Sequence, residues 1–198
     1  MIKFNNLNQG IPYLLFESKY NKALDAGQNF IEAISISSFN SKINEVDSRY
    51  VNLKFITNDE FIFFSNYESP KAAAFDSNNQ IAALVHWPCT NVQIRMKAKI
   101  KKTSKEFNQK YFFDRSNKKN ALAISSHQSK QIDSYNQVTK NFNKSLKNDD
   151  LNVCPEYWGG FSFTPYYFEF WEGHKLRINK REAYNKIDGV WKRLLLQP

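Results

Sequence analysis

The most distinctive sequence lies in the C-terminal stretch, which reads Tyr157-Trp-Gly-Gly-Phe161, Glu169-Phe-Trp-Glu-Gly173 and Arg177-Ile-Asn-Lys-Arg181. Arg177, Asn179 and Arg181 are separated by even offsets, so on an extended strand all three side chains would project from one face. Two guanidinium groups with an amide between them suit a planar, anionic ligand. The sequence therefore predicts a binding site built by this stretch, followed by a closing apolar strand over 190–198.

The segments before this stretch predict strands more often than helices. Ile11 to Ala26 is expected to form a helix, because Pro12 lies in its first turn and Gly27 follows its end. Runs rich in Ile, Val and Phe, separated by Asn, Asp and Ser, then predict strands over 30–39, 49–56, 60–65, 80–87 and 91–101. The break at 57–59 is a hairpin signal.

Helices are expected between the two groups of strands. Ser69 is a good N-cap and Pro70 suits a first helical position, so a short helix should begin there. Longer helices are expected over Ser104–Arg115 and within 117–147, and strands return from Gly160. Strands in succession with inserted helices favour a mainly β fold, a β-barrel decorated by helices. We expect one domain over 1–198, since no repeat or linker divides the chain.

Composition limits the class of protein. Aromatic residues make up 16% of the chain, with six glycines and six prolines, which is typical of a folded protein. No apolar run approaches the roughly 20 residues that cross a bilayer, and the N-terminus lacks a signal-peptide pattern. Cys89 and Cys154 match no disulfide framework and no metal-ligand spacing. We therefore expect a cytoplasmic protein without a bound metal.

The net charge of +9 is concentrated in one segment, where ten Lys or Arg residues between Arg95 and Lys119 face only Glu106 and Asp114. Such a segment can bind nucleic acid or a phosphorylated small molecule, or simply confer solubility. No zinc-finger spacing and no aromatic ribonucleoprotein motif accompanies it. We do not expect a nucleic-acid partner.

Three groups of residues could hold phosphate. Lys71 lies at a predicted helix start, where N–H groups attract anions, although an ordinary capped helix is the alternative. Arg49 and Lys54 are an odd number of residues apart, so on a regular strand they would face opposite sides and serve two anions, or one would be solvated. Tyr111 and Arg115 share a helix face at i, i+4 and could grip a phosphate, unless the Tyr packs on the core and the Arg is exposed.

Other catalytic classes find no support in the sequence. The three histidines, His86, His127 and His174, form no HExxH motif, and no serine lies in a nucleophile-elbow context. A Walker loop and a Gly-x-Gly-x-x-Gly motif are also absent. The residues alone indicate a β-rich domain with several places for phosphate groups and aromatic rings.

Taken in order, these motifs resemble the pyridoxine (pyridoxamine) 5′-phosphate oxidases over nearly the whole chain from about Pro12. The resemblance rests on Ser48-Arg-Tyr-Val-Asn-Leu-Lys54, Phe63-Phe-Ser-Asn66, Ser69-Pro-Lys-Ala72, Gln93, Tyr111-Phe112, Arg115, Gln128-Ser129, Trp158-Gly-Gly-Phe161, Glu169-Phe-Trp171, Arg177, Arg181 and 191–198. It implies a split β-barrel homodimer with FMN at the subunit interface, in which 157–198 completes the barrel and the active site.

The resemblance also implies residue roles. FMN would be held by Arg49, Tyr50, Val51, Asn52, Leu53, Lys54, Phe64, Ser65, Lys71, Gln93, Gln128, Ser129, Trp171 and Arg181. The phosphate of a B6 vitamer would be gripped by Lys54, Tyr111 and Arg115, with Arg177 over the pyridine ring. The substrate C4′ would then face flavin N5 for hydride transfer, and oxygen would reoxidise the flavin to give peroxide.

Several residues depart from the family pattern. Pro70 replaces an arginine expected at the FMN phosphate, and Lys119 falls near a serine expected on the substrate phosphate. Asn179 replaces a histidine beside the substrate ring; as a candidate catalytic residue with Arg177, it can keep a hydrogen bond but carries no proton. The residues before the first predicted helix do not resemble the basic segment that covers the substrate in the family.

Three functions therefore stay open at the level of sequence. The first is an FMN-dependent oxidase of pyridoxine or pyridoxamine 5′-phosphate. The second is an FMN enzyme acting on another planar substrate, similar to the phenazine-biosynthesis oxidases. The third is a non-catalytic binder of FMN or pyridoxal phosphate. Asn179 and the N-terminal residues separate these functions, because they would touch the substrate and not the flavin.

Overall fold

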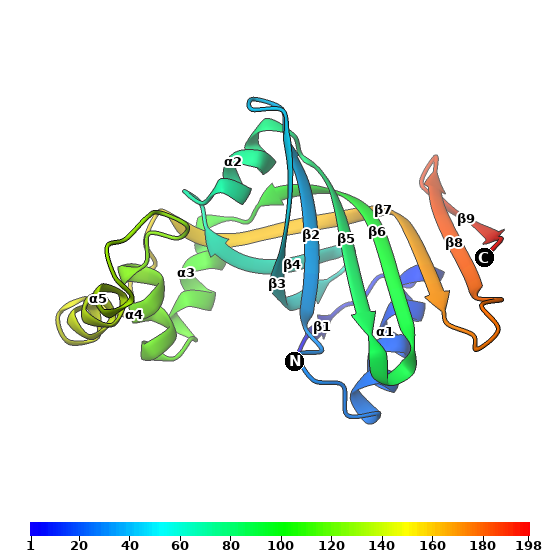
Figure 1. The fold of residues 1–198 in the computed structure, drawn as a ribbon, viewed down its shortest axis with the longest axis horizontal. Helices are drawn as coiled ribbons and strands as arrows, with labels where there is room; N and C mark the ends of the chain where they lie inside the picture. Colours follow the sequence, from blue (N-terminus) through cyan, green and yellow to red (C-terminus); the bar gives the residue numbers. More distant parts are fainter.

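Six strands close into a barrel in the computed structural model, which describes residues 1–198 (Figure 1). The ring runs β3-β2-β5-β6-β7-β4, and β4 pairs back to β3. Its strands are β2 (Ala33–Asn40), β3 (Glu45–Thr57), β4 (Glu60–Asn66), β5 (Gln80–Trp87), β6 (Val92–Lys102) and β7 (Trp158–Glu172). All pairs within the ring are antiparallel, while the short β1 (Lys3–Asn5) runs parallel beside β3.

The long strand β7 carries the chain out of the barrel. Its first part, Trp158–Phe163, pairs with β4, and its last part, Tyr167–Glu172, pairs with β8 (Lys180–Ile187). Strand β6 lies along its other side over nearly the whole length. The hairpin of β8 and β9 (Val190–Leu196) therefore extends beyond the ring, at the right of Figure 1.

The barrel core is aromatic. Phe61 stacks on Phe163 with ring centroids 5.2 Å apart, and both side chains are fully buried. Helix α1 (Ile11–Asp25) packs Phe16 edge-on against Phe61 at 5.1 Å and against Trp87 at 5.6 Å. Each such side chain contributes about 1.5–3 kcal/mol on burial. The helix is thus held to the barrel by its apolar face.

The other helices gather near the start of β7 (Figure 1). They are α2 (Pro70–Ser77), α3 (Lys105–Phe113), α4 (Asn117–Ser125) and α5 (Tyr135–Asn148), whereas the 3-10 helix η1 (Pro88–Thr90) joins β5 to β6, near the far end of β7. Ser104 caps α3, because its Oγ accepts from the Phe107 N–H at 3.2 Å. Helices α3 to α5 form a lobe outside the barrel.

The predicted mainly β class with inserted helices is confirmed, as are the helix over Ile11–Asp25, the hairpin at Asn58 and the closing strand β9. Some boundaries differ. β2 begins at Ala33, because Phe30 takes a positive φ of 49° in a turn, and β3 begins already at Glu45. Helical residues within 117–147 are divided by a loop over 126–134.

The prediction that Arg177, Asn179 and Arg181 share one strand face is wrong. Strand β8 begins at Lys180, and 173–179 form a loop in which Arg177 has a φ of 60°. Asn179 Oδ1 accepts from the His174 N–H at 3.0 Å, and the Arg177 N–H donates to His174 O at 2.9 Å. These hydrogen bonds join residues within one turn and not residues of neighbouring strands. The even spacing therefore does not place the three side chains on one face.

None of the helices combines the length and the apolar character that crossing a bilayer requires.

Candidate active site

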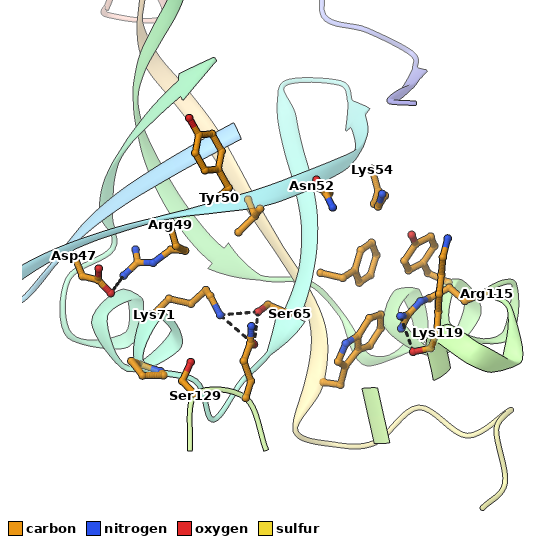
Figure 2. A pocket seen from close by; sticks show the side chains of 16 residues that line it. Asp47, Arg49, Tyr50, Asn52, Lys54, Ser65, Lys71, Arg115, Lys119 and Ser129 are labelled. Carbon is orange, nitrogen blue, oxygen red and sulfur yellow. Dashed lines mark hydrogen bonds and ion pairs between the residues drawn. The ribbon is translucent and has the colours of Figure 1, made fainter. Parts of the chain in front are cut away.

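A cavity of about 510 Å³ opens between β3, the end of β4, α2 and the helical lobe (Figure 2). That size falls in the range of small-molecule sites, about 300–1,000 Å³. Its lining is Asp47, Arg49, Tyr50, Val51, Asn52, Lys54, Phe64, Ser65, Pro70, Lys71, Tyr111, Arg115, Lys119, Gln128, Ser129 and Trp158. Five of these side chains are basic and one is acidic, so the cavity suits an anionic ligand.

Lys71 forms one end of the cavity, in the first turn of α2. Its side chain is only 7% exposed, and its Nζ donates to Ser65 Oγ at 2.9 Å, Ser69 Oγ at 3.1 Å and Gln128 Oε1 at 3.1 Å. Burial, and then the charge of Arg49, lower the pKa of Lys71 to about 8. All three acceptors are neutral. A buried ammonium group without a bonded anion is costly, and a bound anion would remove that cost.

Arg49 lies beside Lys71 and is anchored by strand β2. Its Nη1 donates to Ile36 O at 3.1 Å and to Ser38 Oγ at 2.8 Å, while Nη2 donates to Asp47 Oδ2 at 2.6 Å. The hydrogen bond from Arg49 holds the pKa of Asp47 below its usual value. Arg49 and Lys71 thus form a first pair of cations.

A second group of cations, Lys54, Arg115 and Lys119, lies at the other end of the cavity (Figure 2). Burial lowers the pKa of Lys54, and the positive charges of Lys119 and Arg115 lower it further. The negative charge of Glu32 opposes this shift. Arg115 Nη2 donates to Lys119 O at 3.0 Å, whereas Nη1 is buried without a partner. A buried N–H without an acceptor is a donor available to a ligand oxygen.

Aromatic rings form the wall beside this second group. The Phe64 and Tyr111 rings stack with centroids 3.8 Å apart, and Phe64 and Trp158 lie 5.2 Å apart with planes only 13° from parallel. The Arg115 guanidinium lies over Trp158, 4.3 Å from the ring centroid. Burial raises the pKa of Tyr111, so its phenol stays protonated and can donate a hydrogen bond.

Two spacing predictions need correction. Arg49 and Lys54 line the same cavity and do not face opposite sides, because the β3–β4 register shifts between Leu53 and Phe55 and leaves Lys54 in a bulge. Arg115 lies beyond the end of α3, where its N–H donates to Phe112 O at 3.1 Å. It still shares the cavity with Tyr111, as the i, i+4 spacing predicted.

Most of the predicted cofactor and substrate residues meet in this cavity, but six do not. Leu53 is buried in the core. The others lie toward the far end of β7: Gln93, Trp171, Arg177, Asn179 and Arg181. Gln93, Trp171 and Arg181 are register neighbours on β6, β7 and β8. They form a second cluster, separated from Trp158 by roughly 40 Å of extended strand.

Two acidic residues of these clusters were assigned no role from the sequence. Asp47 is two residues before Arg49 on the same strand, so the alternation of side chains could have placed it beside the guanidinium. Glu169 is 2% exposed and accepts from Arg181 Nε at 2.9 Å and Arg95 Nη1 at 3.2 Å. No sequence spacing indicates this contact, because it depends on the pairing of β6, β7 and β8.

Comparison with known proteins gives three agreeing results. Residues 158–198 match the profile described as the pyridoxine 5′-phosphate oxidase C-terminal dimerisation region. Proteins named pyridoxine/pyridoxamine 5′-phosphate oxidase from Hydrogenovibrio crunogenus and Alteromonas mediterranea are 31% and 33% identical to this chain over 191 residues. Both alignments cover 94% of this chain, with 88% and 89% of the relatives.

Solved structures share the fold. PhzG from Burkholderia lata 383, in complex with tetrahydrophenazine-1-carboxylic acid, has a TM-score of 0.89 at 23% identity, over 94% of this chain and 92% of PhzG. A pyridoxamine 5′-phosphate oxidase-related, FMN-binding protein from Nostoc punctiforme PCC 73102 has a TM-score of 0.77 at 13% identity, over 92% and 97% of the chains.

The barrel with its attached hairpin is therefore the split β-barrel of the FMN-binding proteins. The sequence identity to the two oxidases, which extends across nearly the whole chain, identifies the family and not only the fold. This chain belongs to the pyridoxine/pyridoxamine 5′-phosphate oxidase family and is an oxidoreductase. The family expected from the sequence motifs is thereby confirmed.

Proposed function

We propose that the protein is an FMN-dependent oxidase that converts pyridoxine 5′-phosphate or pyridoxamine 5′-phosphate to pyridoxal 5′-phosphate, with oxygen as the acceptor. One observation carries this proposal: the cavity has cations at both ends and an aromatic wall beside one of them. Two phosphorylated ligands, a cofactor and a substrate, would use both ends. A single small anion would leave one end uncompensated.

The residues at the Lys71 end fit the FMN phosphate. Lys71 and Arg49 supply two charges, the Ser65 hydroxyl and the Gln128 side-chain amide N–H supply hydrogen-bond donors, and α2 directs its N-terminus to the same place. Pro70 contributes no charge here, which leaves the phosphate two cations at this end. We propose that Tyr50, Val51, Asn52, Phe64 and Ser129 complete the contacts to FMN.

The residues at the Arg115 end fit the substrate phosphate. The free Nη1 of Arg115 supplies a donor, Tyr111 a phenolic O–H, and Lys54 and Lys119 two point charges. When bound, FMN supplies the chemistry, acceptance of a hydride and its transfer to oxygen. The protein side chains hold the two ligands in a fixed orientation relative to each other and exclude water from the aromatic wall.

We further propose a homodimer in which a second copy supplies Gln93, Trp171, Arg177, Asn179 and Arg181 to this cavity. The matched dimerisation region spans 158–198 and contains all but Gln93. Apolar side chains in it are strongly exposed in the single chain: Leu176, Ile178 and Leu195. Such a surface is typical of an interface. In this proposal 1–198 act as one unit, and 157–198 complete both barrel and site.

An anaerobic titration tests the proposed reaction. Protein loaded with FMN should lose its flavin absorbance on addition of pyridoxine 5′-phosphate, with formation of pyridoxal 5′-phosphate, and admission of air should restore the absorbance with formation of peroxide. Protein that stays colourless in the presence of FMN would contradict the proposal at its first step.

A second candidate is an FMN oxidase of another planar substrate. The engagement of Asn179 Oδ1 by its own loop favours it, because that oxygen is occupied before any substrate binds. The likeness to PhzG is consistent with this candidate in fold. Bleaching of the flavin by a reduced phenazine carboxylic acid, but by no B6 vitamer, would select it.

A further inference from the structure

Asp47 is the one acidic side chain in the cavity, and it lies on the guanidinium that a bound phosphate would need. Its Oδ2 is 2.6 Å from Arg49 Nη2, and its Oδ1 accepts from the Ser48 N–H at 2.7 Å. Figure 2 shows this ion pair on the same side of the cavity as Lys71. A carboxylate is therefore placed inside a site built for an anion.

We propose that Asp47 is an internal competitor for the phosphate group of the cofactor: it occupies Arg49 in the ligand-free protein and must release it when a phosphate binds. This inference rests on the proposed function, and it adds a residue that sets the affinity and the anion selectivity of the same site.

The hydrogen bonds of Arg49 argue against a role for Asp47 in positioning that side chain. Nη1 is already fixed by Ile36 O and Ser38 Oγ, both from strand β2. Nη2, in contrast, has Asp47 as its single acceptor. Removing the carboxylate would leave the guanidinium anchored and would free a donor that points to the cavity.

A carboxylate and a phosphate cannot both use this donor at low cost. Both groups only accept hydrogen bonds near neutral pH, and like charges at contact distance repel strongly. The Asp47 side chain is 67% exposed, so it can turn into solvent without losing packing. Because an exposed ion pair is weak, a phosphate dianion can displace the carboxylate. A monoanion such as acetate carries the same charge as the carboxylate and so gains no electrostatic advantage by displacing it. Asp47 would thus select dianions.

The experiment compares Asp47→Asn, which removes the charge and keeps the shape, with Glu45→Gln. Glu45 is exposed, lies two residues earlier on the same strand and does not line the cavity, so this variant has the same change in net charge. Titration of the proteins with FMN, followed by flavin fluorescence, should give a Kd that is about three- to tenfold lower for Asp47→Asn. Glu45→Gln should bind as the wild type does.

Two outcomes of the FMN titration would overturn the inference. An unchanged Kd would show that the carboxylate does not compete, and a higher Kd would show that it positions Arg49. Asp47→Ser gives the same comparison if Asp47→Asn folds poorly. If the wild-type protein does not bind FMN, that result contradicts the proposed function but not the competition by Asp47. The competition can then be tested with inorganic phosphate as the probe. Thermal stabilisation by phosphate should be larger for Asp47→Asn than for the wild type, and equal stabilisation would contradict competition.

Discussion

Glu169 holds Arg181 in place across strands β7 and β8: its Oε1 lies 2.9 Å from Arg181 Nε and 2.8 Å from Arg181 Nη2. Its other oxygen accepts from Arg95 Nη1 at 3.2 Å and from the Tyr167 hydroxyl at 2.9 Å. A nearly inaccessible carboxylate is thus paired with two guanidinium groups, which makes it a structural centre of the C-terminal cluster.

Replacement of Glu169 by Gln should lower the free energy of unfolding by about 1.5–3 kcal/mol, because the partly exposed Arg181 and the half-exposed Arg95 lose the charge of a buried carboxylate. Urea unfolding followed by tryptophan fluorescence measures this change. Replacing Glu156, whose pair with Lys105 is exposed on both sides, should cost less than about 1 kcal/mol. Similar losses in both variants would mean that the Glu169 cluster is no stronger than a surface pair.

Replacement of Arg115 by Ala should raise the KM for pyridoxine 5′-phosphate by about tenfold or more, since a charged hydrogen bond contributes about 1.5–3 kcal/mol. The Kd for FMN should change much less, because Arg115 belongs to the second group of cations. Lys71→Met should show the reverse pattern, with FMN binding more strongly impaired. Equal losses of both ligands in either variant would contradict two separate phosphate sites.

Lys71 should make FMN affinity depend on pH. Its pKa is lowered to about 8 in the ligand-free protein by burial, then by Arg49, against the opposing effect of Asp47. A bound phosphate favours the ammonium form and raises this pKa, so the complex keeps a proton that the free protein loses. Affinity should therefore fall as the pH rises above about 8, and Lys71→Met should lack this fall. A wild-type Kd that stays constant through this range would exclude the mechanism.

The same residue has the opposite effect on the stability of the ligand-free protein. In the unfolded chain a lysine keeps its proton up to about pH 10.4, whereas folded Lys71 loses it near pH 8. The unfolded state thus binds more protons between these values, and the contribution of Lys71 to stability rises with pH. Chemical unfolding at several pH values, with Lys71→Met as the reference, measures this slope.

Leu195→Asp should convert the proposed dimer to monomers, because a charge would replace an apolar side chain that is 69% exposed in strand β9. Val153→Asp is the matched control, an exposed apolar residue outside the dimerisation region. Analytical ultracentrifugation would measure the mass of each variant. The absorbance of the flavin would measure how much FMN the variant retains. A Leu195→Asp dimer with full FMN content would contradict this interface.

Much of the fold follows from local sequence. Strands such as β5 and β6 alternate buried and exposed residues regularly, so composition and turn signals located them within a residue or two. The loop at 173–179 was missed because its structure depends on side-chain bonds within a turn, chiefly that of Asn179, which resemble no periodic pattern.

The candidate site was less predictable from the residues alone. Arg49, Lys71 and Gln128 are distant in sequence and meet only after the barrel closes and the lobe folds back over it. Gln128 lies in the loop that interrupts a predicted helix, and Lys54 reaches the cavity through a bulge. Family motifs indicated these residues as a group, whereas Asp47, outside the motifs, needed the geometry.

Strand β7 has a genetic consequence. Trp158 at its start lies in the cavity, and Trp171 near its end lies in the distant cluster, so in the proposed dimer each copy serves two different active sites. A chain defective at Lys71 and a chain defective at Arg181 should then complement each other. Of the two sites in their mixed dimer, one would inherit both lesions and the other would be intact, so this mixed dimer would have about half the activity of a wild-type dimer although both parents are inactive.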